Sequence, residues 1–211
     1  MDIFQRCWTG FAIVSVALAT WISHAPVPVA TLTIIGILFV LGVAFSIPES
    51  QLFGAAFVSI LGYLSFEADF YVNAVTNIGL LAPLSIWGYL NWQKRAEHGQ
   101  LEASLPVTKL LWVLGITTVA VFIIYAFSGN WNGYMPFLDA LTGVLPIVAT
   151  LLMVLAYREQ WLFWIPFNAL QAYMWFGAAS LAPDVVAVFI LKLVFLLNSL
   201  IGFHYWRKKV T

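Results

Sequence analysis

Long apolar runs, broken at intervals by polar residues, proline or glycine, fill almost the whole chain. A helix that crosses a membrane needs about 20 mostly apolar residues, with a range of about 17–25. The runs between the breaks predict eight such helices, at residues 4–23, 28–46, 51–66, 70–92, 108–128, 135–156, 160–180 and 184–206. The longest predicted loop is Gln93–Val107, and the other loops have only a few residues. The pattern therefore predicts an all-α integral membrane protein.

Composition strengthens this prediction. Of the 211 residues, 63% are hydrophobic and only 9% are charged, whereas soluble proteins carry about 25% charged residues. So few charges cannot cover a water-facing surface, and the apolar excess is expected to face the lipid bilayer. The formal net charge is zero, so nothing in the composition indicates a nucleic-acid partner.

The candidate chemistry for an enzyme is sparse. Cys7 is the only cysteine, and His24, His98 and His204 are widely separated, so we expect no metal site. The sequence has no cluster of acidic residues and histidines, no nucleophile motif and no phosphate-binding loop, which argues against a membrane enzyme and against a bound cofactor. The apolar stretch Cys7–Ile22 follows Arg6 as in a signal peptide, but it lacks a small-residue cleavage site, and we interpret it as a membrane helix.

The basic residues indicate an orientation. Cytoplasmic loops carry an excess of Lys and Arg. With the N-terminus inside, the predicted cytoplasmic segments hold eight of the nine basic residues: Arg6, Lys94, Arg95, Lys109, Arg158, Arg207, Lys208 and Lys209. The outer segments carry acidic residues instead: Glu67, Asp69, Asp139 and Asp184. This segregation predicts eight spans with both termini in the cytoplasm.

Two parts of the chain resemble each other. Glu49-Ser-Gln-Leu-Phe matches Glu159-Gln-Trp-Leu-Phe at an offset of 110 residues, and the stretch 85–95 matches 199–209 at an offset of 114. This predicts an extra N-terminal helix (1–24), a three-helix repeat (27–95), a loop and linker helix (96–130) and a second three-helix repeat (135–209). Parallel repeats of this 3+1+3 kind occur in SWEET-type transporters, whose solute site lies near the membrane midplane between the repeats.

The predicted seventh helix carries the main candidate site. Trp161, Trp164 and Asn168 lie at positions i, i+3 and i+7 and form one stripe, and Gln171 and Tyr173 add polar groups. Two aromatic planes and an amide suit a flat heteroaromatic ring, and a cationic ring gains further attraction from them. The alternative is that the tryptophans belong to an aromatic belt at the membrane surface.

Two charged residues in predicted helices also have functional and structural interpretations. Lys192 lies near mid-bilayer, where a charge costs about 2.5–3.5 kcal/mol on insertion scales, so it is expected to face a cavity or a partner. Ser199, seven residues later, shares its face. Asp139 either contacts solute in the outer vestibule or complements a helix dipole. Asn198 either lines a path or joins helices by hydrogen bonds.

Several motifs resemble those of the PnuC family of vitamin transporters. Pro136-Phe-Leu-Asp139 resembles the family's Pro-Phe-Trp-Asp, and Glu159 to Asn168 resembles its Glu-x-Trp-x-x-Trp-x-x-x-Asn stretch. Gly202 and Trp206 resemble its Gly-x-x-x-Trp ending, which Gly88 and Trp92 repeat in the first half. The resemblance covers the predicted helices 2–8.

This resemblance implies a carrier in a bacterial inner membrane that moves nicotinamide riboside, or thiamine or another vitamin, by facilitated diffusion. It also implies a cytoplasmic kinase that traps the vitamin, a SWEET-like fold and a homotrimer. By the same resemblance Trp161, Trp164 and Asn168 are the main binding residues and Asp139 comes next. Lys192 departs from expectation, because a charged lysine repels cationic nicotinamide riboside.

Other functions remain as alternatives. A SWEET-like sugar transporter also uses tryptophan stripes. A retinal protein would use Lys192 as a Schiff base, but it requires a central carboxylate and seven helices, and the sequence predicts neither.

Overall fold

The computed structural model of the chain describes residues 2–67, 75–128, 136–179 and 186–209. These residues form helices and contain no β-strand beyond one isolated bridge. In chain order the elements are α1 (Ile3–Ile22), α2 (Val27–Ala44), α3 (Ser50–Glu67), η1 (Thr76–Leu81), α5 (Ala82–Glu97), α6 (Val107–Ser128), α7 (Pro136–Val154), η3 (Arg158–Gln160), α8 (Trp161–Ala179) and α9 (Val186–Lys209).

The predicted ranges overlap these helices, with two differences at their ends. α5 continues to Glu97, although the sequence predicted a loop from Gln93, and α9 continues to Lys209. Both helices have basic residues in the last turn, where a positive charge complements the negative end of the helix dipole. By length and apolarity alone, four of the described helices qualify as membrane spans: α1, α2, α6 and α9.

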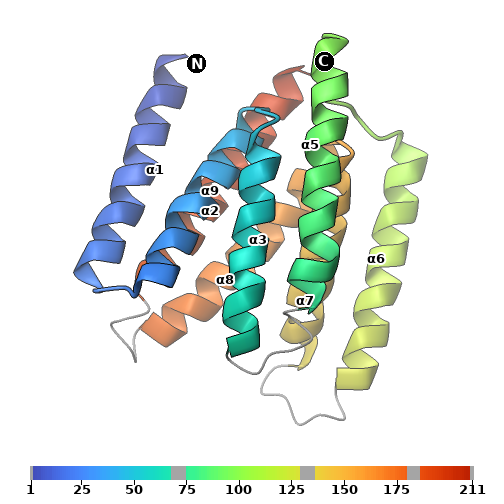
Figure 1. Cartoon of the computed structure of the whole chain (residues 1–211). Helices are drawn as coiled ribbons and strands as arrows, with labels where there is room; N and C mark the ends of the chain where they lie inside the picture. Colours follow the sequence, from blue (N-terminus) through green and yellow to red (C-terminus); the bar gives the residue numbers. More distant parts are fainter. Residues whose placement is uncertain (1, 68–74, 129–135, 180–185, 210–211) are drawn as a thin grey trace.

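The helices run side by side in one bundle, with α1 and α6 at opposite edges (Figure 1). In the middle, α2 packs on α3 and α3 on α5, and these three helices form a first group. α7 packs on α8 and α8 on α9, and these three helices form a second group. The two groups meet where α2 contacts α9 and where α5 contacts α7. The first helix of each group thus contacts the last helix of the other.

α2 and α7 end in the same way. Each is followed by a residue in the left-handed conformation, Ser46 with φ of 61° and Ala156 with φ of 58°. The backbone N–H of the next residue bonds to the carbonyl five residues before it, at 2.8 Å after Ser46 and at 2.9 Å after Ala156. This is the Schellman arrangement, which satisfies carbonyls at a helix end. Ser46 and Ala156 are related by the sequence offset of 110.

Two tryptophans join these helix ends to the opposite group. Trp92 of α5 donates its indole N–H to the carbonyl of Met153 in α7 at 2.8 Å. Trp206 of α9 donates its indole N–H to the carbonyl of Val43 in α2 at 3.0 Å. Both tryptophans are fully buried, and their ring centroids lie 5.5 Å apart. The two bonds are therefore equivalent. One runs from the group of α5 to the group of α7, and the other runs from the group of α9 to the group of α2.

α1 is fixed to this bundle by polar contacts with α9 and α2. The amide of Asn198 accepts a bond from the Trp8 indole N–H at 3.1 Å and donates to the Val40 carbonyl at 2.6 Å. Tyr205 donates its hydroxyl to Asp2 at 2.7 Å, so the two ends of the chain lie at the same end of the bundle (Figure 1). Of the two interpretations of Asn198, the structure supports the hydrogen bond between helices.

A π-helical turn, η1, precedes α5. Pro83 has no N–H, so it cannot bond to the carbonyl four residues before it. The N–H of Ala82 bonds instead to the carbonyl of Asn77, five residues back. The sequence predicted one helix over residues 70–92 in which Pro83 could make a kink, and residues 70–74 lie outside the described residues.

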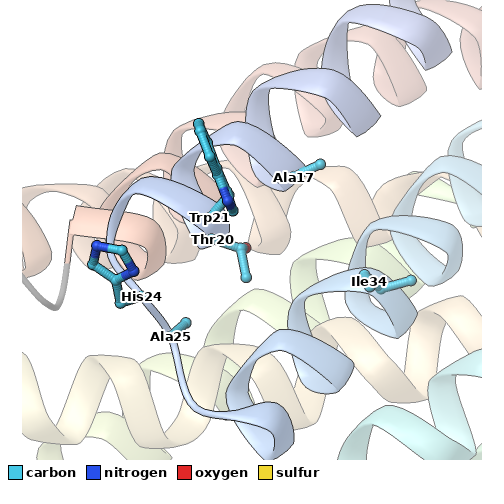
Figure 2. A pocket seen from close by; sticks show the side chains of 6 residues that line it. All are labelled: Ala17, Thr20, Trp21, His24, Ala25 and Ile34. Carbon is cyan, nitrogen blue, oxygen red and sulfur yellow. The ribbon is translucent and has the colours of Figure 1, made fainter.

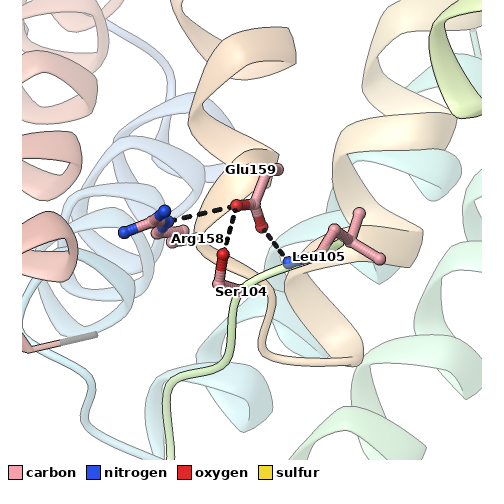
Figure 3. A network of polar contacts seen from close by, with 4 residues as sticks. All are labelled: Ser104, Leu105, Arg158 and Glu159. Carbon is pink, nitrogen blue, oxygen red and sulfur yellow. Dashed lines mark hydrogen bonds and ion pairs between the residues drawn. The ribbon is translucent and has the colours of Figure 1, made fainter. Parts of the chain in front are cut away.

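Residues 101–105, here called the strap, lie between α5 and α6 and bind to the turn after α7 and to η3, just before α8. The N–H of Ala103 donates to the Ala156 carbonyl, and the N–H of Arg158 donates to the Ala103 carbonyl, both at 2.9 Å. Glu159 accepts bonds from the Ser104 hydroxyl at 3.0 Å and from the Leu105 N–H at 2.9 Å (Figure 3). The strap therefore joins the two groups of helices along their shared end.

An ion pair also holds the strap to α9. Lys209 donates to Glu102 at 2.7 Å, and the Glu102 side chain is almost completely buried. Burial raises the pKa of Glu102, but hydrogen bonds, first among them that from Lys209, together with the positive charge of Lys209 lower it more, so the net pKa is below its usual value of 4.5. The pair therefore stabilises the fold above the unfolded-state pKa, and this stabilisation is lost as pH falls through the lowered folded-state pKa.

We predict that Glu102→Gln lowers the free energy of unfolding of the purified protein at pH 7 by about 0.5–1 kcal/mol, the usual range for a partly exposed ion pair. The difference from the parent protein should shrink below pH 4.5, because the parent's Glu102 then becomes neutral too. Thermal melting at several pH values measures this. Glu97→Gln, which removes an exposed carboxylate at the end of α5, is the control. A pH-independent difference would contradict the assignment.

Candidate functional site

Asn168 lies in the interior of the bundle, in the first half of α8. Only 4% of its surface is exposed. Its amide nitrogen donates to the Ser199 hydroxyl of α9 at 2.7 Å and makes a longer contact of 3.5 Å with the Phe195 carbonyl. The Ser199 hydroxyl in turn donates to the same Phe195 carbonyl at 2.8 Å. These bonds fix the orientation of the amide.

The amide oxygen of Asn168 is different. It is buried and has no hydrogen-bond partner among the described residues. A buried polar atom without a partner costs free energy, and native proteins contain few of them. This oxygen is therefore available to accept a hydrogen bond from a solute.

Trp161 and Trp164 occupy different surroundings although they share a stripe with Asn168. The Trp161 ring is buried against Gly202, where a side chain at position 202 would overlap it, and it contacts the edge of Trp206 with centroids 6.1 Å apart. Trp164 is only half-buried and contacts Phe167. Trp161 thus packs in the closed end of the bundle, while Trp164 keeps part of its ring free one turn from Asn168.

Lys192 lies beside a buried aromatic cluster. Its ammonium is 5.8 Å from the centre of the Phe195 ring. That ring lies 6.3 Å from Phe57 of α3, and Gly36 of α2 leaves room for both rings. On α9, Lys192, Phe195 and Ser199 share one face, as their spacing predicts. The lysine therefore lies on the same face of α9 as the serine that binds Asn168.

The remaining predicted site residues are less closely connected. Gln171 is half-buried on the same stripe of α8. Tyr173 is 66% exposed, because five residues of helix turn it about 140° away from Asn168. The side chain of Asp139 lies outside the described residues.

Two cavities in the described part of the chain lie elsewhere. One of about 440 Å³ opens at the turn between α1 and α2, beside Thr20, Trp21 and His24 (Figure 2). Its hydroxyl, from Thr20, already bonds to the Val16 carbonyl at 2.7 Å. The other, of about 560 Å³, is an apolar groove between α1 and α9. Neither cavity contains a predicted site residue.

Sequence reasoning placed Ser199 on the face of Lys192 but missed its bond to Asn168. It also missed the contacts between Trp92, Trp161 and Trp206. The repeated Gly-x-x-x-Trp ending was the available signal, because a glycine one turn before a tryptophan leaves space for a neighbouring side chain. No group of three or more His, Cys, Asp or Glu side chains suited to a metal ion occurs in the described parts of the chain.

A bundle of apolar helices with an interior amide and an interior lysine defines a multi-pass membrane protein. Comparison with known proteins identifies the family. The profile described as "Nicotinamide mononucleotide transporter" matches residues 26–208. The chain therefore belongs to this transporter family, the PnuC family, as its motifs predicted.

Individual relatives agree. The chain is 27% identical to the nicotinamide riboside transporter PnuC of Haemophilus influenzae over 98% of this chain and 94% of that protein. It is 30% identical to the protein of the same name from Neisseria mucosa, over 83% of this chain and 70% of that one. A solved structure, the "Crystal structure of the Vitamin B3 transporter PnuC", superposes with a TM-score of 0.82 and 26% identity, covering 100% and 93% of the two chains. These relatives support a bacterial inner-membrane location.

We predict that Ser199→Ala weakens solute binding about threefold to tenfold, the range expected when one hydrogen bond between membrane helices is lost. The amide of Asn168 would then lose its short bond and its fixed orientation. Ser85→Ala is the matched control, because Ser85 is equally buried at the corresponding position and, like Ser199, bonds to the carbonyl four residues before it, but it does not hold Asn168. Binding to both variants, measured by tryptophan fluorescence, tests this, and equal affinities would contradict it.

Proposed function

We propose that this protein carries nicotinamide riboside into the cytoplasm by facilitated diffusion, and that a cytoplasmic kinase traps it by phosphorylation. Family membership and the names of two relatives support the cargo. The observation that carries the proposal is the fixed amide of Asn168 with its unpaired oxygen. A nicotinamide carboxamide has an N–H that pairs with this oxygen, and the half-buried Trp164 supplies an aromatic face one turn away.

We also propose eight membrane spans with both termini in the cytoplasm. The hydrogen bond between Asp2 and Tyr205 supports placing both ends on one side. The last turns of α5 and α9, which hold five basic residues, lie at this same end (Figure 1). An excess of Lys and Arg favours the cytoplasm.

We infer that the 3+1+3 duplication, with a SWEET-like arrangement, underlies these spans. Its support is that positions related by the sequence offsets make the same contacts. The left-handed residues Ser46 and Ala156 correspond, and so do the bonds made by Trp92 and Trp206. The family resemblance further carries the proposal of a homotrimer, which light scattering of the detergent-solubilised protein tests.

We predict that nicotinamide riboside quenches the tryptophan fluorescence of the purified protein and that Asn168→Leu weakens this binding about tenfold or more, because a site built to hydrogen-bond a polar group discriminates strongly. Asn91→Leu is the control, since Asn91 also donates an amide bond across helices, to Val154, but lies at the closed end. The same titration with nicotinamide mononucleotide, thiamine, riboflavin and glucose separates the cargoes.

Each outcome of this titration has a distinct meaning. A response to thiamine or riboflavin alone would keep vitamin transport and change the cargo. A response to glucose alone would favour the sugar alternative. Silence towards all the vitamins would overturn the proposed function. Equal binding by the Asn168→Leu and Asn91→Leu variants would overturn the site.

Lys192 generates a separate prediction about cargo charge. Nicotinamide riboside is cationic, so a nearby ammonium opposes its binding in a medium of low dielectric constant. We predict that Lys192→Met, which keeps the length and loses the charge, tightens binding of nicotinamide riboside several-fold and weakens binding of anionic nicotinamide mononucleotide. Lys109→Met, at the exposed start of α6, is the control. Unchanged affinity for both solutes would place the ammonium away from the bound ring.

A further inference from the structure

The end of the bundle that holds both termini is closed by three tryptophans. Trp92 and Trp206 are fully buried, and Trp161 is nearly so. Leu101 of the strap and Met153 of α7 belong to the same apolar cluster. Side chains from both groups of helices thus pack together at this end.

The hydrogen bonds of two of these tryptophans run between the groups. Trp92 ties α5 to α7 through Met153, and Trp206 ties α9 to α2 through Val43. The two groups therefore cannot separate at this end unless both indole bonds break and the two rings part. A single packing contact would not make the separation of α5 from α7 and the separation of α9 from α2 occur together.

The position of the tryptophan pair relative to the interior amide is also informative. Trp92 follows Ser85 by seven residues and Trp206 follows Ser199 by seven residues, which is about 10.5 Å along each helix. Ser199 holds Asn168. The tryptophan pair therefore lies between the interior amide and the end of the bundle with the basic residues.

We propose that Trp92 and Trp206 form the cytoplasmic gate of the solute path, an indole latch whose two N–H···O=C bonds hold the exit shut and break together when solute leaves. The assignment of this end as the cytoplasmic exit rests on the proposed function. It assigns gating roles to two residues that do not contact the solute.

Polar groups beside the latch favour its opening. The side-chain amide of Gln51 is buried against Gly88, and its polar atoms have no partner among the described residues. The indole N–H of Trp161 is buried against Gly202 and is likewise unpaired there. Opening the exit to water would hydrate both groups, because buried polar atoms without partners are unfavourable. The closed latch is thus opposed by its own neighbours, which suits a gate that opens reversibly.

Thiol labelling tests the latch without any solute. In a Cys7→Ser background, Ser85→Cys places one thiol behind Trp92, seven residues deeper in α5. Inside-out and right-side-out membrane vesicles are then treated with a membrane-impermeant thiol reagent. We expect Trp92→Phe and Trp206→Phe each to raise the labelling rate about fivefold from the cytoplasmic side, since each loses one buried hydrogen bond of ordinary strength while keeping an aromatic ring. The double variant should be labelled faster still.

The control is Trp112→Phe, because Trp112 is exposed on α6 far from the latch. Unchanged cytoplasmic labelling in both single variants and in the double variant would overturn the proposal. An equal rise from both sides of the membrane would also overturn it, because that result indicates general loosening. Where a Phe variant fails to fold, benzothienylalanine, which has the ring shape of tryptophan without the N–H, makes the same comparison.

The outcome is separable from that of the proposed function. Side-specific labelling with no binding of vitamins would leave the gate intact and reject the cargo. Vitamin binding with unchanged labelling would support the proposed cargo and reject the gate.

Discussion

The structure depends on how the ends of α2 and α7 satisfy their backbone carbonyls. A helix end inside a membrane protein cannot rely on water for this purpose. Each of these helices ends in a left-handed residue, Ser46 or Ala156, although neither is glycine. The carbonyls of Val43 and Met153 then accept an additional bond from a tryptophan of the other group of helices. Each group therefore completes the helix end of its counterpart. At this end the two groups are tied together by these bonds, by the bonds of Asn91 and Arg95 to the end of α7, by the strap and by the packed rings.

This arrangement changes the meaning of the tryptophan stripe on α8. Aromatic rings at the start of a membrane helix serve equally well as a ligand platform or as packing, and the sequence does not distinguish the two roles. The absence of a side chain at Gly202 decides for Trp161, whose ring fills that space and meets Trp206. Trp164, one turn deeper, has no such glycine beside it and remains half-buried. Neighbouring turns of one helix thus carry one tryptophan that packs in the bundle and one whose ring stays partly accessible.

The helices themselves could be predicted well, because uninterrupted apolar runs and their breakers determine where a membrane helix begins and ends. The ends of α5 and the π-helical turn before Pro83 could not, since polar helix ends resemble loops and the widened turn depends on a single missing N–H. The bond between Asn168 and Ser199 was also beyond the sequence. It depends on the relative rotation and height of α8 and α9, and these follow from packing across the whole bundle. The repeated Gly-x-x-x-Trp ending was visible, but its partners lie far away along the chain.

Lys192 is the residue for which the described contacts offset least of the free-energy cost of placing a charge in the membrane. A charge near the bilayer centre costs about 2.5–3.5 kcal/mol on insertion scales, and a cation over an aromatic ring recovers about 0.5–2 kcal/mol. The Phe195 ring at 5.8 Å therefore leaves part of the cost unpaid even in a favourable case. A cationic cargo near the ammonium would add to this cost, and an anionic cargo would reduce it. The electrostatic environment of Lys192 and the charge of the proposed cargo are therefore linked.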